Sequence, residues 1–401
     1  VVRTSYADPF YSKLALEAIQ AWKKQEVWED AYHESGVLVL GDTDSADDYK
    51  HKAYLHDQEI GVRILPLENP AGLRQVFPPH AAVGTFETRA GYLNRDSGWA
   101  NAGQGVSLLM KQVTALHGKI LVGKNAIELI HQAENFKTTG VRCSDGSILE
   151  ADLVVLATGS WTRSAFPDLP GGNIYQATGQ CVAMIQLSQD EAELYKDCPV
   201  VLDFKTGFYI FPVKCHHVAA VPNLCTVGYT RSIQVGSTKI STPRTVVSDP
   251  ETGLLIPKAN VRELREGLRT VYPNLAEKPF IGTRMCWYAA RYNDSFDSDW
   301  VIGFHPDSEK SLMFATGGSG MLETSRYSIA MTSEHVGHAY KFLPVIGQIA
   351  ADAIEEKLSP ELVAKFSPQR TRNHKDESRR DIPPEELDMS QLCTVDDLRQ
   401  Y

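Results

Sequence analysis

LVVLATG, residues Leu153–Gly159, is the strongest local indication of the fold class in this chain. An apolar run of this length that ends in glycine is typical of a fully buried parallel strand entering a turn that faces a ligand. A second run of this kind, Leu312–Thr316, leads into the glycine-rich turn Gly317–Gly320. Between them, segments such as Ala177–Leu187 and Val200–Phe204 alternate loosely, which indicates antiparallel strands. We therefore predict a mixed α/β (α+β) fold, with an α/β nucleotide-binding lobe and a separate antiparallel-sheet lobe.

Composition excludes several classes of function. A chain of 401 residues is long enough for two lobes, and its net charge of −10 argues against nucleic acid or an anionic membrane as a partner. No apolar run reaches the roughly 18 residues that a membrane span needs. The seven cysteines are scattered without a C-x-x-C pair, which favours a reducing compartment. We expect a monomer of the cytoplasm or peroxisome that is not secreted, although the last residues are not a peroxisomal tripeptide.

One expected motif is absent. The chain has no G-x-G-x-x-G run after a first strand, which is the usual phosphate-binding turn of a dinucleotide-binding domain. Either the ligand is not a dinucleotide, or the first unit of the domain lies upstream of Val1.

Three groups of residues favour the second explanation. They are GYLNRDSGWANAGQG (Gly91–Gly105), MCWY (Met285–Tyr288) followed by DSDWVIGFHP (Asp297–Pro306), and ATGGSG (Ala315–Gly320) followed by HAYKFLPVIG (His338–Gly347). Together, in this order, they resemble the flavin-dependent amine oxidases of the D-amino-acid oxidase superfamily. The branch is that of sarcosine oxidase, saccharopine oxidase and fructosyl amino acid oxidase, and the resemblance extends to about residue 360.

The resemblance implies a fold and a reaction. The fold is a Rossmann-like FAD-binding lobe that lacks its first βαβ unit, joined to an antiparallel-sheet substrate lobe. The reaction is oxidation of the C–N bond of a secondary amine or N-substituted amino acid, with O2 as the acceptor and an imine and H2O2 as products. The implied boundaries are 1–31, 119–180 and 287–360 for the FAD-binding lobe, 32–118 and 181–286 for the substrate lobe, and 361–401 for a C-terminal surface arm.

Two other interpretations stay open from the residues. The chain could be an inactive, truncated family member, or the product of a wrongly assembled gene, that does not bind FAD. It could also be a nicotinamide-dependent dehydrogenase, against which MCWY argues.

Three residues carry the chemistry that the resemblance implies. Cys286 would bind FAD covalently, because only a thiolate is nucleophilic enough to form that thioether; the alternative is a buried strand cysteine. Lys341 would bind the substrate carboxylate. A cation on the first turn of a helix opposes the macrodipole by some tenths of a kcal/mol, so its position needs a reason beyond an exposed lysine. Arg3 would pair with the same carboxylate through its guanidinium fork, or is simply a solvated arginine.

Further residues would contact the cofactor. Trp99 resembles a residue beside the isoalloxazine ring, although a tryptophan is more often part of the core. Thr158 and Gly159 resemble a turn that passes the FAD phosphates. The turn Gly317, Gly318, Ser319 and Gly320 would let backbone N–H groups approach the flavin, or is a plain tight turn.

Some segments depart from the family pattern. Cys215–Thr230 fits poorly, and its pair His216 and His217 lacks matching ligands, so we predict no metal site. Met321–Gly337 separates the glycine turn from the Lys341 segment. It spans seventeen codons, so it preserves the reading frame, and we hypothesise that it is an unspliced intron rather than a functional loop.

Overall fold

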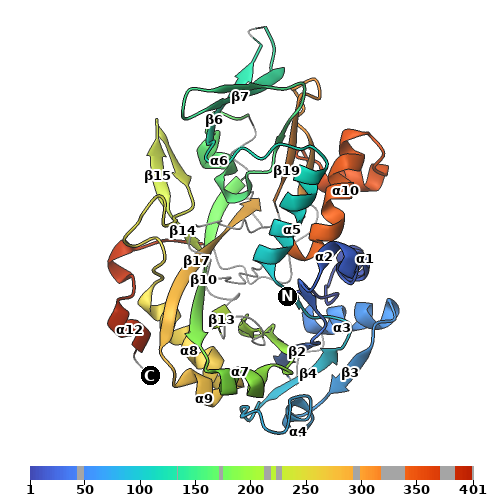
Figure 1. Ribbon diagram of the computed structural model, residues 1–401, viewed down its shortest axis with the longest axis vertical. Coiled ribbons are helices and arrows are strands. Elements are labelled where there is room, and N and C mark those ends of the chain that lie inside the picture. The colour runs from blue at the N-terminus through green and yellow to red at the C-terminus, as the bar shows by residue number, and fades with distance from the viewer. Residues whose placement is uncertain are drawn as a thin grey trace.

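The computed structural model describes residues 1–42, 49–132, 134–170, 175–211, 218–222, 228–291, 299–317, 339–370 and 384–399. Within these ranges the protein is a mixed α/β fold built from several small sheets, which confirms the predicted fold class (Figure 1). The helices are α1 (Pro9–Trp22), α2 (Gln25–Trp28), α3 (Tyr49–Glu59), α4 (Pro70–Arg74), α5 (Ala102–Ala115), α6 (Thr162–Ala165), α7 (Gln189–Tyr195), α8 (Lys258–Val271), α9 (Pro273–Ala276), α10 (Leu343–Ile354), α11 (Pro360–Phe366) and α12 (Val395–Arg399), with the 3-10 helices η1 (Gly159–Trp161), η3 (Tyr340–Phe342) and η4 (Met389–Gln391).

Two antiparallel strands, β10 and β17, run through the middle of the molecule (Figure 1). They pair from Tyr175 opposite Arg291 to Ile185 opposite Phe280. One sheet contains β10 (Tyr175–Gln186), β17 (Phe280–Arg291), β13 (Val218–Pro222), β14 (Tyr229–Thr230) and β20 (Glu385–Glu386). A second has the order β12 (Tyr209–Ile210), β11 (Val200–Asp203), β2 (Val37–Asp42), β4 (Arg89–Asn94) and β3 (Ile64–Leu67).

The remaining strands form smaller sheets. β18 (Val301–Phe304), β19 (Leu312–Thr316) and β9 (Val154–Leu156) form one, and β6 (Ala126–His131), β7 (Thr138–Cys143) and β8 (Ile148–Glu150) form another. Two-stranded pairs join β1 (Tyr32–His33) to β5 (Trp99–Ala100) and β15 (Ser232–Val235) to β16 (Thr238–Ser241).

The LVVLATG stretch forms β9, and its predicted parallel pairing is confirmed. β9 runs parallel to β19, with Val154 opposite Leu312 and Leu156 opposite Phe314. The prediction of a fully buried strand is wrong, because the side chain of Val155 is 41% exposed. β9 is an edge strand of the described sheet, and its successive side chains point to opposite faces, of which the one that carries Val155 is exposed. The turns after β9 and β19 therefore lie at the same edge of one sheet.

Helix α1 follows the sequence signals closely. The side chain of Asp8 caps it by accepting a hydrogen bond from the Phe10 backbone N–H at 2.8 Å, and Pro9 occupies its first turn. Its buried face includes Leu14, Ile19 and Trp22, as the periodicity predicts. This face packs α1 against the segment that leads into α10.

The described parts of the C-terminal segment, residues 361–370 and 384–399, are not a loose surface arm, so that prediction is corrected for them. Phe366 of α11 is fully buried against Trp300, and β20 adds to the central sheet by pairing with β14. Cys393 and Leu398 enter the largest core cluster. The charged and proline-rich composition hid these anchoring apolar residues, which are separated by residues 371–383, outside the described ranges.

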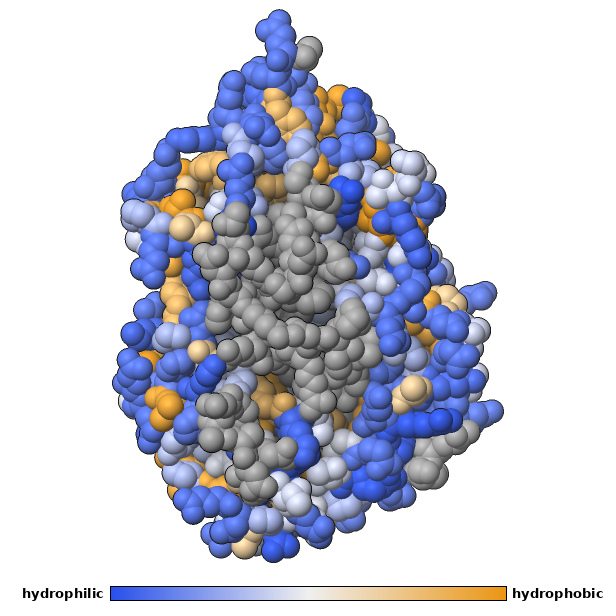
Figure 2. Space-filling model, turned by 180° about the vertical axis from the view of Figure 1, so that it is seen from behind, coloured by the Kyte–Doolittle hydropathy of each residue, from blue (hydrophilic) through white to orange (hydrophobic). Residues whose placement is uncertain are grey.

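The outer surface is mainly hydrophilic on the face seen in Figure 2, where apolar side chains stand in small separate groups. Among the described residues, no helix has the length and apolar character needed to cross a membrane.

Phe366→Ala tests the anchoring of the C-terminal segment. Phe366 stacks on Trp300 at 5.5 Å between ring centroids and contacts Phe10 edge-on, so truncation leaves a cavity in this aromatic cluster. We expect the free energy of unfolding to fall by about 3–5 kcal/mol, measured by urea denaturation. Val363→Ala on the same helix, where the side chain is 53% exposed, should change it by less than about 0.5 kcal/mol. Equal effects of the two substitutions would contradict this anchoring role.

Candidate active site

Arg3 and Lys341, which are 338 positions apart in sequence, lie around one aromatic ring. The guanidinium carbon of Arg3 is 4.6 Å from the centroid of the Tyr6 ring, and the Lys341 ammonium is 5.0 Å from the same centroid. Arg3 also lies 5.2 Å from the ring of Phe204. Both cationic side chains are buried, with exposed fractions of 7% and 8%. The structure thus brings together the two residues that the sequence assigned to carboxylate binding.

This pair of cations has no carboxylate partner among the residues that the structure describes. Neither residue forms an ion pair with a carboxylate in the part of the chain that the structure describes. Nη1 of Arg3 is buried without a hydrogen-bond partner. Burial, and then repulsion by Arg3, holds the pKa of Lys341 well below its usual value. A bound anion would therefore stabilise this site, because it could pair with the unpartnered Nη1 of Arg3 and with the Lys341 ammonium.

Lys341 is held by its backbone rather than by its ammonium. The indole N–H of Trp22 donates a 2.8 Å hydrogen bond to the Lys341 carbonyl, and the hydroxyl of the neighbouring Tyr340 donates to the carbonyl of Ala102 at 3.2 Å. Contrary to the sequence prediction, Lys341 does not lie on the first turn of an α-helix. It lies on η3, and α10 begins at Leu343 with Pro344 in its first turn, where proline is favoured.

Cys286 lies on β17, opposite Gln180 of β10, and is 5% exposed. It belongs to the same apolar cluster as Trp99, and Phe204, which contacts Arg3, packs against that cluster. The other aromatic members of this cluster are Tyr92, Tyr209, Phe211 and Tyr288. Trp99 stacks on His33 with ring centroids 4.2 Å apart. The predicted cofactor residues Cys286 and Trp99 therefore share one core that borders Arg3 through Phe204.

The glycine turns are described in part. Gly159 has φ +50° and begins η1, whose first turn is closed by Thr162 donating to the Gly159 carbonyl at 2.7 Å. Thr158 Oγ1 lies 2.9 Å from Thr162 Oγ1. Gly317 has φ +79°, and a Cβ there would come within 3.1 Å of the Val301 backbone nitrogen. The backbone conformation and the close packing already account for a glycine at this position. Gly318, Ser319 and Gly320 lie outside the described residues, as does the whole of Met321–Gly337.

Two residues of the site were not singled out from the sequence. Tyr6 lies in the VVRTSY stretch that carries Arg3, and an aromatic ring three positions after a buried arginine is a signal that could have been used. Asp57 accepts hydrogen bonds from Thr4 and Ser5, which follow Arg3. No sequence pattern singles it out, because it lies in a charged helix without apolar periodicity. In the described part of the chain, no three His, Cys, Asp or Glu side chains gather as a metal site; His216 and His217 are outside it.

Lys341→Met tests the unpaired buried charge. A lysine whose pKa is held well below its usual value by burial and by Arg3 costs folding free energy at pH 7 whether it keeps or loses its proton, so the variant should be more stable than wild type by about 1–4 kcal/mol. Because the pKa of Lys341 is lower in the folded than in the unfolded state, wild-type stability should rise with pH between these two values. The difference in the free energy of unfolding between Lys341→Met and wild type should therefore shrink towards pH 10.5. Urea unfolding at several pH values measures it.

Lys310→Met is the matched control, since Lys310 is exposed and paired with Glu356. It should show no such pH-dependent gain. Two results would contradict a buried Lys341 with a lowered pKa. One is a Lys341→Met protein less stable than wild type at pH 7, and the other is a stability difference that does not change with pH.

Comparison with known proteins agrees with these features. A family model described as FAD dependent oxidoreductase matches residues 1–353. L-saccharopine oxidase of Schizosaccharomyces pombe is 28% identical over 383 residues, which are 90% of this chain and 80% of that protein. N-methyl-L-tryptophan oxidase of Escherichia coli is 23% identical over 384 residues, covering 90% and 84%.

Solved structures share the fold. The fructosamine oxidase Amadoriase II of Aspergillus fumigatus superimposes with a TM-score of 0.76 at 23% identity, over 99% of this chain and 86% of that one. Fructosyl peptide oxidase of E. terrenum gives a TM-score of 0.78 at 22% identity, over 95% and 83%. Since the family model spans most of the chain and the fold agrees, the protein belongs to the FAD-dependent oxidoreductase family.

Proposed function

We propose that the protein oxidises the C–N bond of a secondary amine that carries a carboxylate, with O2 as the acceptor and an imine and H2O2 as products. Saccharopine-like, fructosyl amino acid-like and sarcosine-like compounds are the candidate substrates. The observation that carries this proposal is the pair of buried cations around Tyr6, Arg3 and Lys341, which have no carboxylate partner in the described part of the chain. Two of the relatives support the same class, because one is an oxidase of L-saccharopine and the other an oxidase of N-methyl-L-tryptophan.

The residues present fit FAD. The parallel strands β9 and β19 end in turns at one edge of a sheet, which is where α/β folds bind dinucleotides, and Thr158, Gly159 and Gly317 lie in these turns. Cys286 is a thiol, not a disulfide, in an apolar cluster with Trp99. We propose that Cys286 binds the cofactor covalently, and that Trp99 and residues Gly317–Gly320 contact it.

The two cations bind and orient the substrate. Arg3 offers its unpartnered Nη1 and Lys341 its ammonium, so one carboxylate can accept hydrogen bonds from both. Burial excludes water, which strengthens both contacts relative to the same pairs in solvent. Pinning the carboxylate fixes the direction of the C–H bond next to nitrogen, and such orientation supplies much of the rate gain in a reaction of this kind. Bound FAD supplies the acceptor for the hydride from that carbon.

The domain division follows from this assignment. We propose residues 1–31, 119–180 and 287–360 as the FAD-binding lobe and residues 32–118 and 181–286 as the substrate lobe. The boundaries near 180 and 286 fall within the paired strands β10 and β17, so these two strands would connect the lobes.

Peroxide release from matched amines tests the reaction. Protein supplied with FAD is assayed with sarcosine, saccharopine, fructosyl-lysine and pipecolate, and with piperidine, which is pipecolate without its carboxylate. We expect turnover of at least one carboxylate-bearing amine and none of piperidine, because Arg3 and Lys341 have nothing to bind there. Lys341→Met should lower kcat/KM for the best substrate by about 10- to 100-fold, since one charge-assisted hydrogen bond is lost. A protein that stays colourless with FAD supplied would contradict the proposal and support an inactive member.

Cys286→Ser tests covalent attachment. Acid-precipitated wild-type protein should form a yellow pellet, whereas the variant should release its flavin into the supernatant, because a serine hydroxyl is too weak a nucleophile to form the bond. Cys181→Ser is the matched control, since Cys181 is equally buried on the paired strand β10. The absorbance of pellet and supernatant near the flavin band measures the outcome, and flavin retained in the Cys286→Ser pellet would exclude this cysteine.

A further inference from the structure

Helix α3 presents a carboxylate to the interior. The residues of α3 that are buried are Ala53 and Asp57, which are four positions apart and so share one face. No described lysine or arginine lies within ion-pair distance of Asp57, which is fully buried. A buried charge without a counter-ion is unfavourable unless hydrogen bonds compensate for lost hydration. Its presence in place of an apolar side chain calls for a specific role.

The hydrogen bonds of Asp57 identify that role. Thr4 Oγ1 donates to Oδ1 at 2.6 Å, and Ser5 Oγ donates to Oδ2 at 2.7 Å. The Tyr92 hydroxyl and the Asn94 side-chain amide each donate to Oδ2 at 3.1 Å. Two of the four donors are therefore the residues that directly follow Arg3, and both are fully buried. Asp57 fixes the short segment from which the Arg3 guanidinium extends.

Other residues of α3 hold the same segment. His56 Nδ1 lies 3.0 Å from the Tyr6 carbonyl. Together with Asp57, the helix thus contacts residues 4, 5 and 6. Because both cations lie near the Tyr6 ring, α3 holds the segment that carries the Arg3 guanidinium and this ring.

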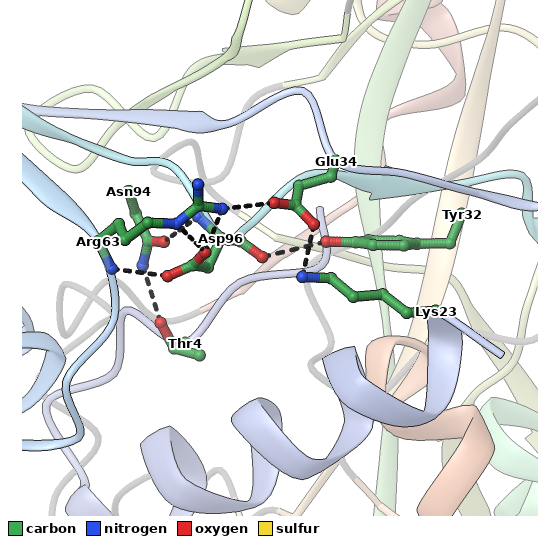
Figure 3. Close-up of polar contacts among 7 residues, drawn as sticks. All are labelled: Thr4, Lys23, Tyr32, Glu34, Arg63, Asn94 and Asp96. Carbon is green, nitrogen blue, oxygen red and sulfur yellow. Dashed lines mark hydrogen bonds and ion pairs between the residues drawn. The ribbon is translucent and has the colours of Figure 1, made fainter.

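A polar network supports this segment from the other side (Figure 3). Asn94 donates to Thr4 Oγ1 at 2.8 Å and accepts from the backbone N–H of Asp96 at 3.2 Å. Asp96 is in turn bound by Arg63, whose guanidinium also contacts Glu34. Exposed ion pairs of this kind add little stability, but here they order the loop whose Gly98 pairs with Val2 through two backbone hydrogen bonds. Arg3 therefore lies between two fixed neighbours.

We propose that Asp57 is a positioning residue for Arg3, whose carboxylate holds Thr4 and Ser5 so that the guanidinium stays beside Tyr6 and Lys341, ready for a ligand carboxylate. The proposal rests on the proposed function, because it takes Arg3 as the carboxylate-binding group. Asp57→Asn has nearly the same shape but replaces an acceptor by a donor, so at least one of the four donors loses its partner. The Arg3 segment should then move, without any change to Arg3 itself.

The experiment measures binding of benzoate and of benzamide to the FAD-supplied protein by titration calorimetry, which needs no turnover. Wild type should prefer benzoate. Asp57→Asn should weaken benzoate binding by about tenfold or more, as expected when a charged hydrogen-bonding group is misplaced. Ser5→Ala removes one donor and should give a smaller loss in the same direction, which covers the case of an unstable Asp57→Asn protein. Asp249→Asn is the control, since this half-buried carboxylate pairs with Arg231, away from the segment.

A double-mutant cycle separates positioning from general damage. In an Arg3→Met background, Asp57→Asn should change benzoate affinity by less than about twofold, because the group it positions is gone. An unchanged affinity in Asp57→Asn, or the same loss with and without Arg3, overturns the positioning role alone. Wild-type protein that binds benzoate no better than benzamide instead contradicts the proposed function.

Discussion

Two buried side chains of like charge, Arg3 and Lys341, lie around one aromatic ring, and the surrounding structure has to hold both in place. Arg3 and Lys341 both lose their hydration, repel each other, and have no carboxylate within ion-pair distance in the described part of the chain. The Tyr6 ring compensates in part through its electron-rich face. Such a pair can persist only if the surrounding scaffold is rigid enough to prevent either side chain from turning towards solvent.

The scaffold supplies that rigidity through aromatic packing. Phe342, next to Lys341, is fully buried and contacts the rings of Tyr6, Tyr11 and Trp300 at 5.0–6.0 Å. The same Tyr6 ring that both cations approach is therefore part of the core between α1 and the β18–β19 sheet. Because close-packed interiors do not deform continuously, displacement of either cation would require the core to repack. The packing of this aromatic core therefore keeps Arg3 and Lys341 in place despite their mutual repulsion.

Sequence reasoning succeeded where a local signal fixed the structure. Asp8 and Pro9 mark the start of α1 unambiguously, and the apolar LVVLATG run identified a strand with a parallel partner. It failed where tertiary contacts decide. Helix α10 begins at Leu343, after Lys341, with Pro344 in its first turn. The side chain of Val155, on the edge strand β9, is exposed. Asp57 could not be found at all, because a carboxylate in a polar helix looks solvated until the chain brings Thr4 and Ser5 to it.

The two cations are not equivalent, and this difference determines how the site responds to a ligand. A guanidinium stays protonated under all ordinary conditions and spreads its charge over a plane that can stack on Tyr6 and Phe204, so Arg3 tolerates burial without losing its proton. An ammonium is a compact charge that releases its proton readily when buried, and the pKa of Lys341 is lowered accordingly. An incoming carboxylate opposes both causes of that lowering, since it offsets the lost hydration and neutralises the repulsion from Arg3. In the proposed function, a bound carboxylate would therefore raise the pKa of Lys341 and favour its charged form, whereas Arg3 stays charged with or without the ligand.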